Sequence, residues 1–320
     1  MRTSHAPLLQ QAWAAFAKGL NPGHVRVLQQ QWHDRQQPPP AHWPLVYARG
    51  FVVGVLSPPH VQAVSDALTR GSIDVVGTDS CVELSSDKSI RLRTRFGESV
   101  LSQQLQRAML WLRAQGLLPG WRDEAMTLYA DVHHQVSIAT VASELCPERL
   151  TGIASFERAG FQLLGSVTHA VHVNAVTPTG RMWCARRALH KATDPGRLDN
   201  VCAGGIPAGE SALATLAREM MEEAGAALSQ CVHVQAAGLV RSARPESAGW
   251  HDEYLHVFNV LFDDDWQPFN TDGEVWSFSL LEPVQVAQAM ADGDMTRDAA
   301  LAVVQGLRSG CTEGITRVFD

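Results

Sequence analysis

The segment from Gly204 to Ala226 constrains this chain more than any other part of the sequence. It reads GGIPAGESALATLAREMMEEAGA and predicts a glycine-rich loop followed by a helix from about Ser211 to Ala224. Ser211 is a favourable N-cap, because its hydroxyl can accept a backbone N–H of the first turn. Gly225 favours the left-handed conformation that ends a helix. The fold must therefore support a loop and a helix at this point.

The end of this predicted helix concentrates negative charge. Glu219, Glu222 and Glu223 stand at positions i, i+3 and i+4, so they share one face. Like charges at this spacing, near the negative end of the helix dipole, destabilise an isolated helix by roughly a few tenths of a kcal/mol per pair. A divalent cation removes this cost, and Mg²⁺ prefers carboxylate oxygens. We therefore predict a metal site of these glutamates, completed by the backbone carbonyl of Ala203.

Other positions of the segment fit the same interpretation. Arg218 can orient a glutamate through a charge-assisted hydrogen bond. The glycines allow the loop to approach the acidic cluster closely. The apolar positions expected to pack inward are Leu213, Leu216, Ala217 and Met220.

The spacing of the segment is more specific than an acidic helix alone. Taken by itself, AREMMEEAG is most simply interpreted as a solvated charged face. Gly204 and Glu210 stand upstream at a fixed spacing and Gly225 follows, and such a pattern arises by chance about 10⁻⁶ times in a chain of this length. The segment is identified as a Nudix box, and the resemblance to the Nudix superfamily covers about residues 165–285.

This resemblance implies an α/β (α+β) fold, with a Nudix α/β/α sandwich preceded by a smaller N-terminal α/β domain. It also implies Mg²⁺ or Mn²⁺ as cofactor and hydrolysis of a diphosphate by attack of water on phosphorus. Glu219, Glu222 and Glu223 are then metal ligands, and one of them also handles the proton of the water. Arg218 and Glu210 are the supporting catalytic residues.

Flanking runs resemble a narrower group, the Nudix domain fused to thiamine pyrophosphokinase in fungi and its stand-alone relatives. These runs are HVNAVTPTGRMWCARRA, DPGRLDNVCAGGIPAGES, GLVRSARP, EYLHVFNV and NTDGEVWSF, with GWRDE (Gly120–Glu124) in the N-terminal half. The implied substrates are thiamine diphosphate or its oxidised (oxy or oxo) analogues, giving a monophosphate and phosphate.

Residues outside the box are candidates for substrate binding. Arg186 and Arg187, near Lys191 and Arg197, form the most basic spot, which is either a phosphate clamp or a solvated loop. Trp250 and Trp276 are aromatic rings that could stack on a substrate ring. The remaining candidates, each of which is equally a turn former or a surface charge, are Asp199, Asn200, Arg241, Arg244, Glu253 and Glu274.

Hydrophobic patterning predicts a mixed order of helices and strands in two domains, residues 1–160 and 161–320. The N-terminal domain could shape the active site or form a dimer contact. Expected helices cover 6–34 (one or two), 58–70, 98–116, 152–160, 211–224, 284–290 and 299–307. Expected strands cover 46–56, 72–95 (two), 126–132, 170–176, 182–186, 232–240, 254–262 and 275–280.

Composition excludes several classes of protein. The net charge is −7 and no concentrated basic run occurs, which disfavours nucleic acid as a partner. The first residues lack the features of a signal peptide, and no apolar stretch approaches the ~20 residues of a membrane span, so a cytoplasmic location away from membranes is expected. The six cysteines show no zinc-like spacing, and His133, His134, His169 and His172 have no ligand partner at such a spacing.

Other functions stay open at this stage. The same chemistry could act on a nucleoside diphosphate derivative of the ADP-ribose or NADH type. A non-catalytic ligand-sensing module is a second alternative, although it has no need of three unpaired carboxylates. A Nudix-fold isomerase would need a nucleophile for which no motif is found. We expect a small-molecule diphosphate as the partner and consider a homodimer.

Overall fold

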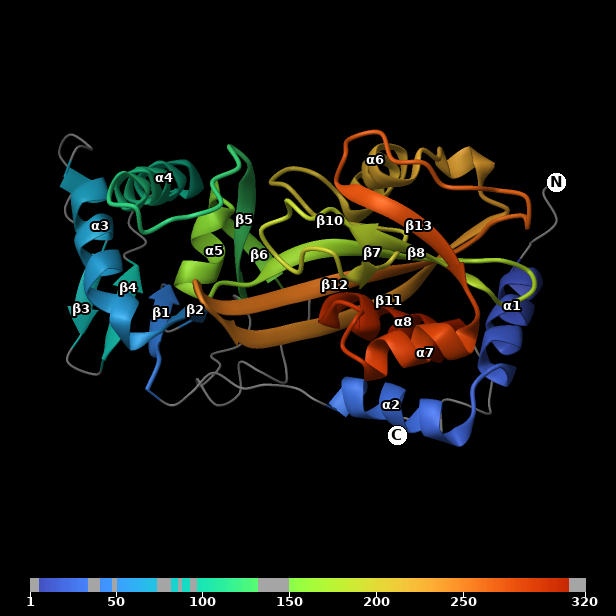
Figure 1. The fold of residues 1–320 in the computed structure, drawn as a ribbon. Helices are drawn as coiled ribbons and strands as arrows, with labels where there is room; N and C mark the ends of the chain where they lie inside the picture. Colours follow the sequence, from blue (N-terminus) through green and yellow to red (C-terminus); the bar gives the residue numbers. More distant parts are fainter. Residues whose placement is uncertain are drawn as a thin grey trace.

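The computed structural model describes residues 6–33, 41–47, 51–73, 82–85, 88–92, 97–131 and 150–310 (Figure 1). The described part combines helices with mixed sheets and is of the α/β class. Among its helices, none has the length and apolar character that crossing a membrane requires.

A seven-stranded sheet dominates the C-terminal half. Its strands follow the order β11-β12-β7-β8-β13, with β10 paired to β7 and β9 paired to β8. β7 and β12 run parallel, and the other pairs run antiparallel. The bounds are β7 Thr168–Val176, β8 Met182–Arg187, β9 Leu198–Asp199, β10 Cys202–Gly205, β11 His233–Glu246, β12 Gly249–Leu261 and β13 Val275–Leu281.

Helices cover both faces of this sheet, as the period-two alternation of β7 requires. Val171 and Val173 pack with Leu216 of α6 (Ala212–Ala224). Ala170 faces the other way and packs with Leu301 of α8 (Arg297–Gly310). Figure 1 shows α6 above the sheet and α8 below it, so this half is an α/β/α sandwich.

The first two helices belong to the core of the C-terminal half. Trp13 and Phe16 of α1 (Ala6–Lys18) and Leu28 of α2 (Pro22–His33) are buried in one cluster with α7 (Pro283–Ala291) and α8. In Figure 1 both helices lie beside α7 and α8, far from the elements that follow them in sequence. The boundary near residue 160 stays a prediction, and this core shows that residues 6–33 pack across it.

The other N-terminal elements form a separate core. A four-stranded sheet has the order β2-β1-β4-β3, and β5 pairs with β6 in a two-stranded sheet. Residues 45–164 supply this core, to which α3 and α4 contribute. The bounds are β1 Trp43–Tyr47, β2 Phe51–Leu56, η1 Pro58–His60, α3 Val61–Ile73, β3 Val82–Ser85, β4 Ser89–Leu92, α4 Glu98–Ala114, β5 Ala125–Asp131, β6 Leu150–Glu157 and α5 Ala159–Leu164. We call residues 41–164 the N-terminal unit.

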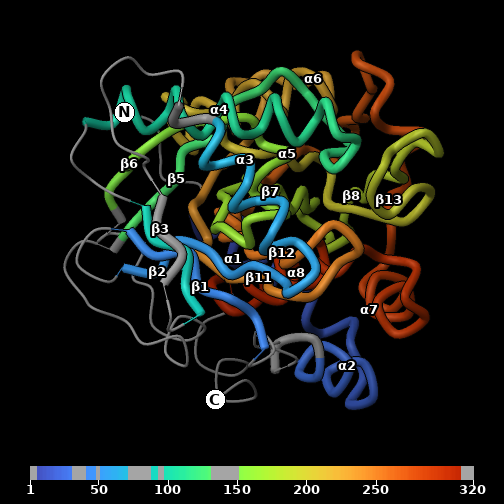
Figure 2. The backbone as a smooth tube through the Cα atoms, turned by 90° about the vertical axis from the view of Figure 1, so that its left-hand side faces the viewer, coloured from blue at the N-terminus to red at the C-terminus, as the bar shows by residue number. Residues whose placement is uncertain are grey.

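The N-terminal unit lies at one end of the large sheet (Figure 1), and Figure 2 views the molecule from that end. Val55 of β2 donates its N–H to the Gly165 carbonyl at 3.2 Å. Val55 also packs with Ala243 and the fully buried Trp250, which lie near the tip of the β11–β12 hairpin. This apolar contact holds the unit against one end of the sheet.

Most expected elements are confirmed, with two corrections. Residues 46–56 form the antiparallel pair β1 and β2 rather than one strand. The helix expected at 152–160 is wrong, because residues 150–157 form β6 paired with β5 and only 159–164 are helical. Pairing along β5 outweighs the weak helical preference of this short apolar run. His133, His134, Cys81, Cys146 and Cys311 lie outside the described residues.

Substitution of Gly180 tests the docking of α1. This glycine has a φ of +83°, and a Cβ added to it would lie 2.5 Å from the backbone nitrogen of Phe16. Gly180→Ala therefore adds a backbone clash to left-handed strain, and we expect a loss of about 2–4 kcal/mol in the free energy of unfolding, measured in urea.

Gly116→Ala is the matched control. Gly116 has a φ of +72°, but an added Cβ there would meet no atom within 4 Å. This variant should lose only about 1–2 kcal/mol, the cost of left-handed strain alone. Equal losses in both variants would contradict the close contact between α1 and the β7–β8 turn.

Candidate functional site

Helix α6 has the ends that its sequence predicts. The Ser211 hydroxyl accepts the Ala214 N–H at 3.2 Å, and Gly225 closes the helix with a φ of +64°. The loop after β12 then crosses this C-terminal end, where the N–H groups of Phe269 and Thr271 donate to the carbonyls of Ala224 and Glu222. The otherwise unpaired helix carbonyls are thereby satisfied.

The buried face of α6 differs in part from the prediction. Leu216 and Met220 are fully buried, as expected, but the inward packing of Leu213 and Ala217 is wrong because both are exposed. Glu219 and Glu223 take part of the buried face instead, with 8% and 7% of their surface exposed. Two carboxylates thus lie where an ordinary amphipathic helix has apolar side chains.

The burial of these two carboxylates is electrostatically costly. Burial and, to a lesser extent, the neighbouring Glu219 carboxylate raise the pKa of Glu223 to about 8, against the 2.9 Å hydrogen bond from the Ala203 N–H. Burial also raises the pKa of Glu219, although Arg218 opposes it. Buried anions require a cation to compensate them.

Arg218 is the centre of a charged network on the same helix. Its Nη1 donates to Glu219 Oε1 at 2.8 Å and to Glu222 Oε2 at 3.0 Å. Its Nη2 donates to Glu210 Oε2 at 3.2 Å. The structure therefore joins four of the five box residues for which a catalytic or metal role is predicted, and Glu223 lies outside this network. The roles of all five stay predictions.

The loop before α6 forms a cradle for the acidic face. A Cβ on Gly204 would lie 1.8 Å from Glu219 Oε1, so only glycine allows this packing. On the other side, the ligand oxygens of Glu223, Asp272 and Glu274 all lie within 4.8 Å of one another. These hard oxygen donors fit a divalent cation. Asp272 was missed from the sequence, although it stands in the run NTDGEVWSF.

A cleft of about 720 Å³ opens beside the cradle. Its lining includes Ala203–Gly205 from the glycine loop, strands β7 and β12, and the first residues of α8. The N-terminal unit closes the opposite side with residues 117–126 and 158–163. The cleft thus lies between the two packed halves, next to the buried carboxylates.

Four of the predicted substrate residues line this cleft: Arg187, Asp199, Arg244 and Glu253. Arg187 pairs with Asp199 at 2.8 Å, and Glu253 accepts the Thr168 hydroxyl at 2.8 Å. Glu274 lies beside the cradle, where it pairs with Lys191. These residues stay candidates for contact with a substrate.

The structure places the other predicted substrate residues elsewhere. Arg186 forms a bidentate pair with Asp294 at 3.0 Å and is absent from the cleft lining. Asn200 is 1% exposed and is consumed by hydrogen bonds with His172 and Asn174. Neither side chain is available to a ligand in the cleft.

The remaining candidates are also outside the cleft lining. Arg241 forms a buried ion pair with Asp252, and their side chains are 12% and 3% exposed. Trp250 is 1% exposed in the contact between the two halves, so it cannot stack on a substrate. Trp276 is 70% exposed on β13.

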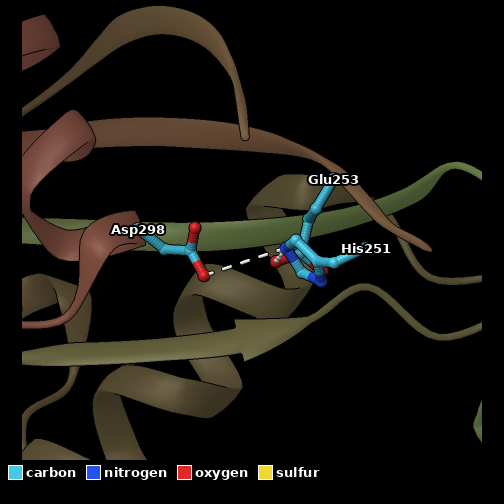
Figure 3. Close-up of side chains that lie close together, drawn as sticks. All are labelled: His251, Glu253 and Asp298. Atoms are coloured by element: carbon cyan, nitrogen blue, oxygen red, sulfur yellow. Dashed lines mark ion pairs between the residues drawn. The ribbon is translucent and has the colours of Figure 1, made fainter. Parts of the chain in front are cut away.

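A second group of polar side chains lies at the β12 and α8 side of the cleft (Figure 3). His251 Nε2 is 3.9 Å from both a Glu253 and an Asp298 carboxylate oxygen. Both oxygens of Asp298 accept hydrogen bonds from Arg244, at 2.8 and 3.2 Å. Because Arg244 already neutralises Asp298, we interpret this group as a charged wall of the cleft.

Two buried groups carry no charge at neutral pH. His169 Nδ1 lies 2.9 Å from His256 Nε2, and burial, with His256 nearby, lowers the pKa of His169 to about 3. Burial raises the pKa of the Cys202 thiol well above its usual value. Cys184, Cys202 and Cys231 are free thiols in the described part of the chain.

Comparisons with known proteins agree with this geometry. Residues 167–300 match the family model described as "NUDIX domain". The chain is 33% identical over 153 residues to Nudix hydrolase 24, chloroplastic, of Arabidopsis thaliana, which covers 47% of this chain and 42% of the plant protein. It is 30% identical over 151 residues to an isopentenyl-diphosphate Delta-isomerase of Streptomyces coelicolor, covering 46% of this chain and 74% of that protein.

The chain also resembles solved structures of low identity. A crystal structure of DR0079 from Deinococcus radiodurans has a TM-score of 0.36 and 18% identity, with 43% of this chain and 80% of that chain covered. The chain spans less than half the length of the plant relative.

The raised pKa of Glu223 predicts how Mg²⁺ binding depends on pH. Protons and Mg²⁺ compete for the same oxygens, so the apparent affinity should rise with pH until the pH exceeds about 8. Below that value we expect the affinity to fall by about 10-fold per pH unit. Calorimetric titration of MgCl₂ at pH 6.5, 7.5 and 9 measures this. The Glu223→Gln protein should bind weakly and with a shallower pH profile, because Glu219 remains and its pKa is also raised. A flat profile for the unmodified protein would refute the competition.

Arg241 should act on stability rather than on substrate binding. Arg241→Met leaves Asp252 buried without its main partner, and we expect a loss of about 3–5 kcal/mol in the free energy of unfolding. Arg241→Met combined with Asp252→Leu should recover most of this loss, because it removes both charges. A stable Arg241→Met protein with a raised KM would instead assign Arg241 to the substrate.

Proposed function

The chain belongs to the NUDIX domain family, and from that premise we propose that it is a divalent-metal-dependent pyrophosphohydrolase acting on a small organic diphosphate. One observation carries the proposal. Glu219 and Glu223 are buried beside a cleft, close to one another and to the glycine loop, with carboxyl pKa values raised by burial. A site that contributes only to stability has no use for two such groups.

The residues divide the work of the reaction in this proposal. When bound, a divalent cation would supply positive charge toward phosphoryl oxygens and make water more acidic. Glu219, Glu222 and Glu223 would hold this cation, with the carbonyl of Ala203 at the edge of the cradle. Arg218 fixes the rotamers of Glu219 and Glu222 by its hydrogen bonds, and Glu210 holds Arg218 in turn. One of the glutamates accepts the proton of the attacking water.

We further propose thiamine diphosphate or its oxidised (oxy or oxo) analogues as the substrate, with a thiamine-type monophosphate as the product. The flanking motifs support this choice. The distribution of charge in the cleft supports it too. The β12 part of the lining carries Glu253, and the N-terminal unit contributes Arg122 and Arg158. A molecule with a diphosphate at one end and a cationic ring at the other complements both sides.

A substrate panel tests the proposal. Phosphate release would be measured with and without Mg²⁺ for thiamine diphosphate, oxythiamine diphosphate, ADP-ribose, NADH and isopentenyl diphosphate. A coupled phosphatase detects cuts that give two monophosphates. We expect metal-dependent hydrolysis confined to the thiamine-type compounds. Preference for ADP-ribose or NADH would keep the chemistry and replace the substrate, and turnover of none would overturn the proposal.

Glu222→Gln is the matched loss-of-function variant for this assay. It removes metal-directed charge from a residue whose side chain is 46% exposed, so the fold should survive. We expect turnover to fall by about 10²-fold or more. Glu98→Gln, in the first turn of α4 and outside the cleft lining, is the control and should retain full turnover. Near-normal turnover of Glu222→Gln at saturating Mg²⁺ would exclude Glu222 as an essential ligand.

A further inference from the structure

Arg122 is a cation of the N-terminal unit with no role in the reaction proposed above. It lies in the turn Gly120–Glu124 and lines the same cleft as the glycine loop Ala203–Gly205. Its side chain is exposed to the cleft, and no carboxylate among the described residues is within ion-pair distance of its guanidinium. The other cations near the cradle are already paired, Lys191 with Glu274 and Arg187 with Asp199.

The backbone around Arg122 is held in an unusual conformation. Gly120 and Asp123 on either side of it have φ values of +78° and +56°. The Trp121 indole N–H donates to Asp123 Oδ1 at 2.6 Å, which stabilises the turn. The Arg122 N–H donates at 3.0 Å to the carboxylate of Glu157, a residue that is only 2% exposed. Left-handed non-glycine residues are often found where function requires one fixed geometry.

Strand β5, which follows this turn directly, is bonded to the glycine-rich loop that precedes α6. The Ala208 N–H donates to the carbonyl of Ala125 at 2.8 Å. Met126 packs so closely on Gly205 that a Cβ there would lie 2.3 Å from its methyl group. Glu124 pairs with Arg158, whose guanidinium also approaches Gly205. The position of Arg122 is therefore fixed relative to the cradle and not only to its own unit.

The electrostatics agree with this placement. Arg122 and Lys191 both line the cleft, and Lys191 pairs with Glu274. A carboxylate oxygen of Glu274 lies within 4.8 Å of oxygens of Glu223 and Asp272. The positive charge of Arg122 therefore lies in the lining of the cleft beside the acidic cradle.

We propose that Arg122 binds phosphate oxygens of the substrate diphosphate, so that the N-terminal unit supplies part of the active site. The inference rests on the proposed diphosphate chemistry. A planar guanidinium can donate two parallel hydrogen bonds to a phosphate group, which is the geometry that arginine provides and lysine does not. Docking of the unit against the sheet then contributes to the reaction, because it brings a cation without an acidic partner among the described residues to the lining of the cleft.

Binding of inorganic pyrophosphate in the presence of Mg²⁺ tests the inference without turnover. Calorimetry on the full chain would compare the unmodified protein with Arg122→Ala, Arg122→Lys and Arg107→Ala. Loss of a charge-assisted bidentate contact should weaken binding on the order of 10- to 100-fold in Arg122→Ala. Arg122→Lys keeps the charge and should lose less. Arg107, an exposed arginine of α4 outside the cleft lining, is the charge-matched control and should bind normally.

Kinetics with the best substrate give a second readout. Arg122→Ala should raise KM more than it lowers kcat, and thermal melts should show that the three variants stay folded. Equal pyrophosphate affinity of Arg122→Ala and the unmodified protein would overturn the inference, as would an unmodified protein that binds no pyrophosphate. Absence of hydrolysis with selective loss of binding in Arg122→Ala would retain the anion site while refuting the proposed reaction, so the two failures are distinguishable.

Discussion

The contact between the Glu219 carboxylate and the backbone of Gly204 is the constraint on which the rest of the site depends. A buried carboxylate needs hydrogen bonds or a compensating charge, and here the opposing loop can approach closely because it has no Cβ at the point of contact. Gly204 removes the Cβ, and the neighbouring Ala203 N–H supplies a hydrogen bond to Glu223. The helix and the loop must therefore keep one register relative to the sheet, and the pairing of β10 with β7 holds the loop in that register.

That register explains why the carboxylates are kept although they cost stability. Packing of Leu216 and Met220 against β7 supplies the apolar burial that holds α6 in place. The adjacent charges are arranged around Arg218, which is one cation shared by three carboxylates. The carboxylates therefore outnumber the cations at this point of the fold, and a divalent cation could neutralise the excess negative charge.

The sequence predicted this helix and its charges because the information is local. The capping residues, the spacing of the glutamates and the glycines all lie within Gly204–Ala226, and the predicted helix bounds agree with α6 to within one residue. The prediction that Leu213 and Ala217 pack inward was wrong, because the period of a helix shows which residues share a face but not which face a sheet will cover. Glu219 and Glu223 took the buried side that apolar residues would take on composition alone.

Long-range pairs were beyond such reasoning. Arg241, Arg186 and Arg244 are equivalent in the sequence, yet only Arg244 lines the cleft, because each has a different acidic partner that the fold supplies from 11 to 108 residues away. Asp272 was missed for the same reason, since its approach to Glu223 depends on the loop that covers the end of α6. The packing of residues 6–33 on α7 and α8 could not be predicted either, because an amphipathic pattern shows which face is buried but not which element covers it.

The charges of the cleft follow from how the two halves meet. Most of its ionic groups are paired within one half, as Arg244 is with Asp298 and Arg187 with Asp199, so they stabilise walls that would otherwise hold unpaired charges. Such pairs make the surface of the cleft polar, but most of their hydrogen-bond donors are already satisfied and cannot bind a highly charged ligand. A diphosphate needs donors that are not already satisfied, and a cation held rigidly on the opposite wall meets that need without the cost of breaking an existing pair. In the proposed binding mode, docking of the N-terminal unit places such a cation beside a cleft in which most other charges are already paired.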